Sequence, residues 1–545
     1  MSHSSKIFNV TPVDVQNRSG YDESHEHILS MPVGTLVPVM CKEIIPNTKI
    51  SLGAFAEVNL PPMATDFYGR VDLEMQAFFV PGRLLFAGFE DTFRHDTGEA
   101  APPGSAISNY LPGCDGVPVD NVLTKNTLAD YLGIKLVATG AQTVPTVTIP
   151  NILPFVGYHL IWQEFYRDSR LQVPCLFGRG SYALSNTVSN AISQLPGFFT
   201  TGNTQLKFTY GSGSSANTTF VDGVSLFDTR QRAYAKDRFT NATYQPQQGS
   251  PTVLQAAVSG GNAQITMGGI FSLYSMDQWK RTRNISGRYG EQQMAEFGCY
   301  PESYICDRPI YLGQTIVNIY NKSVYQGNSL TTAYPSTSQY NPFSSSTGAK
   351  YGSPLGVGSG SLIDSFTATE RGYLYVIASI VPHAYYSSGS DMKFFRYRVG
   401  DFASPLLQST GDEPLFKSEL LDTYGSFGEF GSSYVFGYTQ RFSDYKWEND
   451  KVSGELRHGG SMDAFALKRN FTGSVTLGSS FIEIPKNALD EVAATSGVLT
   501  SNFGAWADIF FNLKMSMPLS AYTIPSLGRM HDAHTVMVDN GGKRL

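Results

Sequence analysis

The stretch Val71-Asp72-Leu73-Glu74-Met75-Gln76-Ala77-Phe78-Phe79 decides the fold class of this 545-residue chain. Its odd-numbered side chains are all apolar, whereas Asp72, Glu74 and Gln76 lie on the opposite face. A period of two indicates a β-strand that is buried on one side only. The pattern ends at Pro81-Gly82, a pair that forms turns.

Further strand patterns lie on both sides of this stretch. Residues 32–45 form one candidate, which stops at Pro46-Asn47. Residues 372–381 are nearly all apolar, as is typical of a strand covered on both faces. Residues 434–442 form another candidate. Residues 505–517 alternate six apolar side chains with polar ones, namely Asp508, Asn512, Lys514 and Ser516.

The middle of the chain differs in pattern. Asn151 and Pro154 fit the start of a helix, and apolar side chains then recur at spacings of three and four residues. Further helices are expected in parts of 231–239 and 276–297. Residues 197–223 and 327–360 are rich in Gly, Ser, Thr and Asn, so we expect surface loops or projections there.

Strands at both ends of the chain must pair across this helical and loop-rich middle. An antiparallel sandwich with a long insertion satisfies that requirement, and we predict a mainly β fold, with a jelly roll as the favoured sandwich of this kind. The absence of an internal repeat argues against propellers and solenoids. The expected parts are an extended arm (1–30), the first strands and loops (31–150), a long insertion with helices and surface loops (151–365), and the remaining strands with a C-terminal tail (366–545).

The composition is consistent with a surface that other subunits cover. Charged residues make up 16% of the chain, against roughly 25% in ordinary globular domains, and aromatic residues make up 13%. Interface cores lose charged groups and gain aromatic rings, because an ion there must give up its water. A secreted β-protein shares this profile, and composition alone does not separate the two interpretations.

Charge and cysteine content narrow the function further. The net charge of −6 excludes a strongly cationic nucleic-acid coat, so any genome contact must be local. The five cysteines show neither a disulfide framework nor zinc-site spacing and are expected to be reduced thiols in a cytoplasmic assembly. No apolar signal segment and no run of about 18 apolar residues occurs, so we expect neither secretion by a recognisable signal nor a membrane span.

The search for catalytic or cofactor motifs finds none. The glycines near residues 211 and 356 lack the rest of a phosphate-binding loop. His531 and His534 could hold a metal but lack a third ligand at a recognisable spacing. Asp72 and Glu74 imitate a catalytic pair, although strand alternation alone generates that arrangement. The acidic cluster Asp444, Glu448 and Asp450 has the ligand type of a divalent ion. We therefore predict no enzyme activity, no cofactor and no metal.

Two basic stretches are candidate genome contacts. The first interleaves cations with rings, as single-strand binding surfaces do, and the second falls near a predicted helix. Each also has a simpler explanation: rings in a strand can belong to the core, and cations on a helix can form a solvated face. The candidate residues are Lys393, Arg396 and Arg398 in the first stretch and Lys280, Arg281 and Arg283 in the second.

Seven segments spread along the chain carry a resemblance to a known family. They are Arg18-Ser19-Gly20-Tyr21-Asp22 (with Gly34-Thr35-Leu36-Val37-Pro38-Val39 in the same opening), Phe78-Phe79-Val80-Pro81-Gly82-Arg83-Leu84, Tyr158-His159-Leu160-Ile161-Trp162-Gln163-Glu164-Phe165-Tyr166-Arg167-Asp168, Lys236-Asp237-Arg238-Phe239-Thr240, Gly287-Arg288-Tyr289-Gly290-Glu291, Arg308-Pro309-Ile310-Tyr311-Leu312-Gly313, and Phe436-Gly437-Tyr438 followed by Val452-Ser453-Gly454-Glu455-Leu456-Arg457. In this order they resemble the major capsid proteins of the microviruses (Microviridae, gokushovirus-like), tailless phages with circular single-stranded DNA. The resemblance implies a single eight-stranded antiparallel viral jelly roll with long helix- and loop-containing insertions.

The resemblance implies a structural major capsid protein in the virion, assembled in the bacterial host cytoplasm. It implies a self-assembled T=1 icosahedral shell of sixty copies around packaged single-stranded DNA. The implied partners are a small basic DNA-packaging protein, a pilot or spike protein, an internal scaffolding protein and a host surface receptor.

One departure concerns the surface projections. The family branch with three-fold projections has a long insert after the segment that Lys236 opens here, but the matching tract, 245–268, is short. The rival interpretation from another class is a glycan-binding β-sandwich fibre or adhesin. A β-sandwich glycosidase comes third, because its acidic signature is missing.

Overall fold

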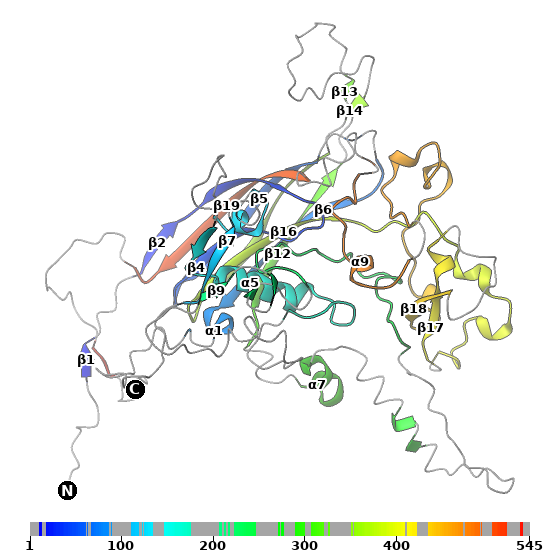
Figure 1. The fold of residues 1–545 in the computed structure, drawn as a ribbon, viewed down its shortest axis with the longest axis horizontal. Coiled ribbons are helices and arrows are strands. Elements are labelled where there is room, and N and C mark those ends of the chain that lie inside the picture. The colour runs from blue at the N-terminus through cyan, green and yellow to red at the C-terminus, as the bar shows by residue number, and fades with distance from the viewer. Residues whose placement is uncertain are drawn as a thin grey trace.

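The computed structural model describes most of the chain, and Figure 1 shows its arrangement. The described residues are 10–12, 18–60, 63, 67–86, 89, 111–118, 123, 125–134, 146–175, 207–209, 212–213, 216–217, 223–246, 271–272, 274–276, 289–299, 307–320, 325–326, 350–351, 354–408, 411–421, 434–471, 475–490, 492, 504–519 and 535–537.

One curled antiparallel sheet dominates the structure (Figure 1). Two short N-terminal strands, β2 and β3, pair with opposite ends of β19, so they act as one interrupted strand and the sheet has eight strand positions. The strands are β2 (Ser19–Asp22), β3 (His25–Met31), β4 (Val37–Ile44), β5 (Lys49–Asn59), β6 (Val71–Pro81), β12 (Ile310–Tyr320), β15 (Leu355–Thr367), β16 (Gly372–Pro382) and β19 (Ala505–Met517).

The strand order divides the sheet into two layers. One layer runs β3-β19-β5-β15 and the other β4-β16-β6-β12. They are joined where β12 meets β15 through only two residue pairs, Ile319 with Gly356 and Tyr320 with Leu355. Sequence-distant strands alternate within each layer, which is the order of a double-layered jelly roll. The predicted fold class is confirmed.

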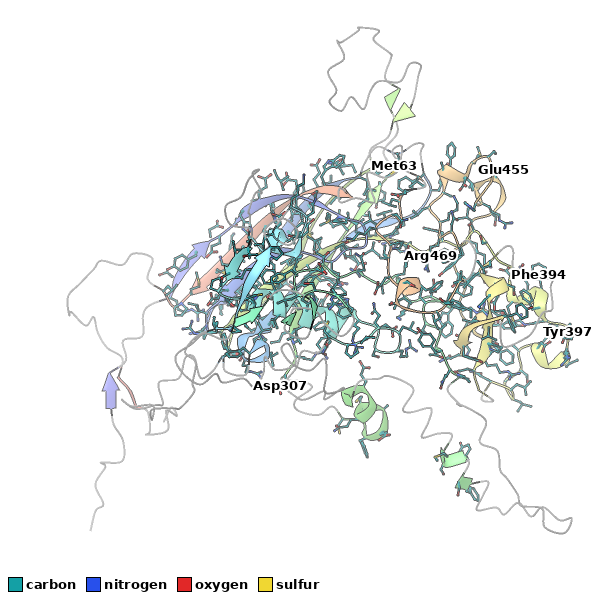
Figure 2. The ribbon with its side chains drawn as sticks, in the orientation of Figure 1. Met63, Asp307, Phe394, Tyr397, Glu455 and Arg469 are labelled. Atoms are coloured by element: carbon teal, nitrogen blue, oxygen red, sulfur yellow. The ribbon has the colours of Figure 1, made fainter. Side chains whose placement is uncertain are left out.

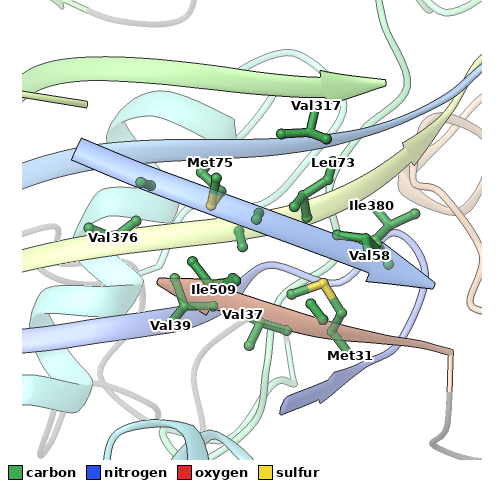
Figure 3. Close-up of a cluster of buried hydrophobic side chains, with 14 of the residues drawn as sticks. Met31, Val37, Val39, Val58, Leu73, Met75, Val317, Val376, Ile380 and Ile509 are labelled. Atoms are coloured by element: carbon green, nitrogen blue, oxygen red, sulfur yellow. The ribbon is translucent and has the colours of Figure 1, made fainter. Parts of the chain in front are cut away.

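The main core lies between the layers. Figure 3 shows side chains from both converging, among them Val58 and Ile509 from one layer and Leu73 and Val376 from the other. All four are no more than 1% exposed. Strict alternation places these side chains inward, because a strand presents every second residue to the same face.

Shorter helices, helical turns and strands lie outside the main sheet. The helices are α1 (Gly82–Leu85), α4 (Leu128–Tyr131), α5 (Leu153–Ile161), α7 (Tyr289–Phe297) and α9 (Ser479–Ile482), with a π-helical turn η1 (Trp162–Tyr166) and 3-10 turns η2 (Met392–Phe395), η3 (Val399–Asp401), η4 (Lys417–Glu419), η6 (Ser443–Tyr445), η7 (Gly454–Leu456) and η8 (Asp463–Phe465). The small strands are β1 (Val10–Pro12), β7 (Gly113–Pro118), β8 (Thr146–Ile149), β9 (Lys207–Thr209), β10 (Ser212–Gly213), β11 (Ala216–Asn217), β13 (Tyr325–Gln326), β14 (Lys350–Tyr351), β17 (Glu413–Phe416), β18 (Val435–Thr439) and β20 (Thr535–Met537).

Helix α5 covers the outer face of the β6 and β16 layer. Its apolar side chains form a second core with Phe78 and Tyr375. The Tyr375 hydroxyl donates to the carbonyl of Pro154 at 2.8 Å. A Cβ atom on Gly157 would lie 2.3 Å from that hydroxyl, so only glycine permits the helix to approach so closely. The predicted helix that starts near Pro154 is confirmed, as is strand burial on both faces of β16.

Other expectations are corrected. Residues 231–239 form no helix: Gln231 and Ala233 make isolated bridges to Thr35 and Glu483, so tertiary pairing holds this segment extended. Residues 355–360 belong to β15 rather than to a surface loop. A Cβ on Gly358 would lie 2.9 Å from the Val317 side chain of β12, which explains the glycine-rich strand.

The two longest excursions from the sheet separate β6 from β12 and β16 from β19, and a shorter one with β13 and β14 separates β12 from β15. The sequence-based division of the chain stays a prediction. It placed all of β12 and most of β15 inside its insertion, and it did not separate the excursion between β16 and β19. This excursion, residues 383–504, is called the late insertion below; Figure 1 shows it in yellow and orange beside the sheet.

Candidate functional site

The carboxylates of the β6 strand each have a cationic partner. Asp72 is 3% exposed. It contacts Arg70 at 2.8 Å and His383 at 3.1 Å. Glu74 forms an ion pair with Arg232. These contacts tie β6 to neighbouring segments. The two carboxylates do not converge on a shared open space, and their arrangement supports a structural role.

Two of the three carboxylates in the acidic cluster of the late insertion form ion pairs with cations. Asp444 pairs with Arg396, and Glu448 pairs with Lys451. Within the described residues, no group of three or more His, Cys, Asp and Glu side chains could hold a metal ion. His531 and His534 lie outside the described residues. That this C-terminal histidine pair binds no metal therefore stays a prediction.

The basic stretch at 393–398 forms 3-10 helix η2 and the turn after it rather than a strand. Lys393 has an exposed side chain and lies 2.8 Å from Asp391. The Arg396 side chain is 6% exposed, because it pairs with Asp444 and its guanidinium carbon lies 4.3 Å from the Tyr445 ring centroid. Arg396 therefore holds two loops together within the subunit.

The rest of the basic candidates are placed differently. Arg398 is exposed, with its guanidinium carbon 4.8 Å from the ring centroid of its neighbour Tyr397. Lys280, Arg281 and Arg283 lie outside the described residues. No finding tests genome contact at any of the six candidates.

An extended segment, residues 230–238, joins the sheet to the late insertion. Every second side chain reaches a different partner. Near the sheet, Arg232 pairs with Glu74, and at the other end Arg238 pairs with Glu419. Burial raises the pKa of Glu419, and the Arg238 guanidinium opposes that shift. The cations and the single tyrosine at every second position of this segment are a signal that the sequence analysis missed.

Exposed apolar side chains gather on the outer face of the β3-β19-β5-β15 layer. We call this surface the aromatic sheet face. Phe510 and Phe55 are cross-strand partners on β19 and β5, and the side chains of the set are 44–74% exposed. The set consists of Ile28, Phe55, Val357, Trp506 and Phe510. The sequence signal for this surface was the pair of rings, Trp506 and Phe510, at outward positions of the alternating strand β19.

A second apolar surface lies on the late insertion. We call residues 394–406 the apolar loop. Val399 is 92% exposed and Leu406 is 89% exposed, and three rings on the same loop are more than half exposed. Figure 2 shows Phe394 and Tyr397 at the outer edge of the molecule. Large apolar side chains exposed in such numbers mark a surface that contacts another molecule.

Two remaining features concern thiols and membranes. Cys41 and Cys299 are free thiols, Cys114 and Cys175 are buried, and Cys306 lies outside the described residues. Burial raises the pKa of the Cys41 thiol to about 12, so this sulfur is protonated and unreactive at neutral pH. Within the described residues, no helix has the length and apolar character needed to cross a membrane.

Comparison with known proteins agrees with the fold. The chain is 22% identical to capsid protein VP1 of Chlamydia phage 1, with 96% of this chain and 98% of that protein covered. It is also 22% identical to capsid protein VP1 of Bdellovibrio phage phiMH2K, with the same two coverages. A sequence profile of the family described as capsid protein (F protein) matches residues 10–527. The chain, a structural component of the virion that assembles into a shell, therefore belongs to the capsid protein (F protein) family.

Proposed function

We propose that sixty copies of this chain form a T=1 icosahedral shell that encloses a circular single-stranded DNA genome. The supporting observation is the pair of exposed apolar surfaces on one subunit, the aromatic sheet face and the apolar loop. Two separate surfaces on each copy allow contacts of more than one kind. A closed shell requires such contacts, because a single self-complementary patch produces only a dimer.

The same surfaces explain the composition. A low-charge, ring-rich exterior is costly in water and favourable against a neighbouring subunit. Trp506 and Phe510 point away from the core on β19, whereas their neighbours Ala507 and Phe511 are buried in it. The strand therefore presents apolar side chains on both faces, as expected for a strand that has a subunit core on one side and a partner on the other.

Genome enclosure requires cations from other sources. At a net charge of −6 per copy, the shell adds negative charge around a negative genome. DNA binding is driven by Lys and Arg that displace counterions. We therefore infer a small basic DNA-packaging protein as a partner. A pilot or spike protein, an internal scaffolding protein, a host surface receptor and assembly in the bacterial cytoplasm complete the proposal.

Local genome contact is proposed at the exposed cations of the two basic stretches. Lys393 and Arg398 each lie beside a ring, at Phe394 and Tyr397, so in this proposal these two rings face the genome. The rest of the apolar loop, with Val399, Phe402 and Leu406, makes the subunit contact. A ring next to a cation suits an unpaired base and its phosphate. Lys280, Arg281 and Arg283 belong to the same proposal on sequence grounds. Lys393 and Arg396 are the weaker candidates, since their ion pairs with Asp391 and Asp444 must break first.

Particle formation tests the proposal. The full-length chain, expressed with and without its candidate partners, is examined by negative-stain microscopy and light scattering. The expected product is a closed icosahedral particle whose mass is roughly 3.6 MDa of protein, sixty times 59.6 kDa. Nuclease-resistant circular DNA in those particles supports genome enclosure. Monomers under every assembly condition, or a shell with another copy number, would contradict it.

A further inference from the structure

A pocket of about 560 Å³ opens on the late insertion. Its volume lies within the range of roughly 300–1,000 Å³ that is typical of small-molecule sites. Residues 386–394 form one wall, residues 444–453 form the other, and Arg238 and Glu419 lie at its base. Apart from Lys393 and Phe394, the residues that line this pocket have no role in the proposed function.

Aromatic rings line the opening of the pocket. Trp447 is 51% exposed, Tyr445 is 54% exposed and Phe394 is 65% exposed, and all three are lining residues. The ring of Tyr445 is fixed from behind by the Arg396 guanidinium, whose carbon lies 4.3 Å from the ring centroid. Rings held this way offer flat apolar faces at little entropic cost.

Between the rings the lining is polar and rich in hydroxyl groups. The polar lining residues without a charge are Ser387, Ser388, Ser390, Asn449 and Ser453. Hydroxyl and amide groups both donate and accept hydrogen bonds, so they match ligands whose own hydroxyls do the same. The Asn449 side-chain oxygen accepts from the Arg238 backbone N–H at 3.4 Å, which orients that amide toward the base of the pocket.

The charges in the pocket are balanced. Lys393 and Lys451 both lie 2.8 Å from Asp391, and Arg238 pairs with Glu419. These cations already have carboxylate partners, so a phosphate would have to displace a carboxylate before binding. An anionic ligand or a DNA backbone therefore gains little here from counterion release.

We propose that this pocket binds a neutral carbohydrate, through stacking of a sugar ring on Trp447 and hydrogen bonds to Asn449 and the serine hydroxyls. A pyranose has apolar C–H faces and a rim of hydroxyls, which corresponds to rings at the opening and polar groups between them. The pocket is separate from the aromatic sheet face. It shares one residue, Phe394, with the apolar loop.

The test uses the full-length chain and three probes, D-glucose, D-galactose and N-acetyl-D-glucosamine. Binding is measured by calorimetry and by tryptophan fluorescence, since Trp447 is one of four tryptophans. We expect saturable binding of at least one sugar at millimolar concentration. Trp447→Ala and Asn449→Ala should each weaken it about tenfold, a loss of about 1.4 kcal/mol, whereas Trp447→Phe keeps a stacking ring and most of the affinity.

The controls distinguish this site from others. Tyr68→Ala removes a ring that is 70% exposed and does not line the pocket, so sugar binding should not change. Circular dichroism verifies that each variant is folded. Three outcomes would overturn the proposal: no saturable binding of any of the three sugars, binding that survives both alanine variants, or a thymidine oligonucleotide that binds more tightly and is lost in the same variants.

Discussion

The jelly roll and the late insertion bury their parts of the chain by different means. In the sheet, backbone groups pair along the strands and apolar side chains fill the space between layers. In the late insertion, strands are short and side chains satisfy much of the backbone: Glu413 accepts from the N–H groups of Phe442 and Ser443, and Glu419 accepts from that of Phe416. An irregular segment needs such partners because buried N–H groups must be bonded.

Arginine takes a different role in the two regions. The guanidinium carbon of Arg469 lies 4.3 Å from the Tyr234 ring centroid, 4.4 Å from that of Phe481 and 5.7 Å from that of Tyr386. Its guanidinium also donates to the Phe481 carbonyl and the Tyr386 hydroxyl. The late insertion therefore uses cations as packing groups, whereas the sheet core is almost purely apolar. The stability of the late insertion should therefore depend on charge more than the stability of the sheet does.

The largest effect is expected at adjacent residues of β19 that point to opposite faces. Phe511→Ala empties a fully buried site between the layers and should cost about 3–5 kcal/mol of unfolding free energy. Phe510→Ala removes a ring that is 44% exposed on the aromatic sheet face. It should leave urea denaturation of the unassembled chain nearly unchanged but reduce shell formation. Equal losses of stability in both variants would refute the assignment of that face to subunit contact.

Next in size is loss of the buried cation that joins the sheet to the late insertion. Arg238→Met leaves Glu419 buried without its partner and should cost about 3 kcal/mol. Adding Glu419→Gln removes the stranded charge and keeps an acceptor for the Phe416 N–H, so the double variant should recover part of the loss. Denaturation curves of both variants check this. A double variant no more stable than the single one would show that the charge is not the source of the loss.

A smaller effect is expected where the two layers join. Gly358→Val places a side chain against Val317 on β12 and should cost about 1–3 kcal/mol through overpacking. Ser359→Val changes the next residue, whose side chain faces outward and is exposed. Thermal melting of the two variants provides the comparison. A stable Gly358→Val variant would mean that β12 and β15 separate without cost.

These positions also show what sequence alone could predict. Strands β6 and β19 were found because alternation is a direct record of burial on one face. Strand β15 was missed because its glycines leave the space that β12 side chains such as Val317 fill, and a missing side chain gives no periodic signal. The segment around Arg238 was misassigned as a helix because its partners come from distant parts of the chain. The same holds for the pocket, whose walls are separated by about fifty residues and meet only in the fold.

The smallest effect concerns acid sensitivity of the late insertion. Hydrogen bonds from Lys393 and Lys451 lower the pKa of Asp391 below its ordinary value. A depressed folded-state pKa means that the stabilisation is present above the ordinary value of 3.8 and is lost as the pH falls through the folded value. Because the carboxylate is partly exposed, its contribution should stay within about 1 kcal/mol.

The Asp391→Asn variant isolates that contribution from other groups, including Glu419, whose raised pKa acts with the opposite sign because its stabilisation falls as pH rises. The wild-type chain should be the more stable of the two near neutral pH, and the difference should shrink below about pH 4. The control Asp364→Asn removes an exposed carboxylate on β15 that accepts from the Ser361 hydroxyl rather than from a lysine. If the two asparagine variants lose the same stability at neutral pH, charge is no more important to the late insertion than to the sheet, and the contrast between the regions lies in backbone pairing alone.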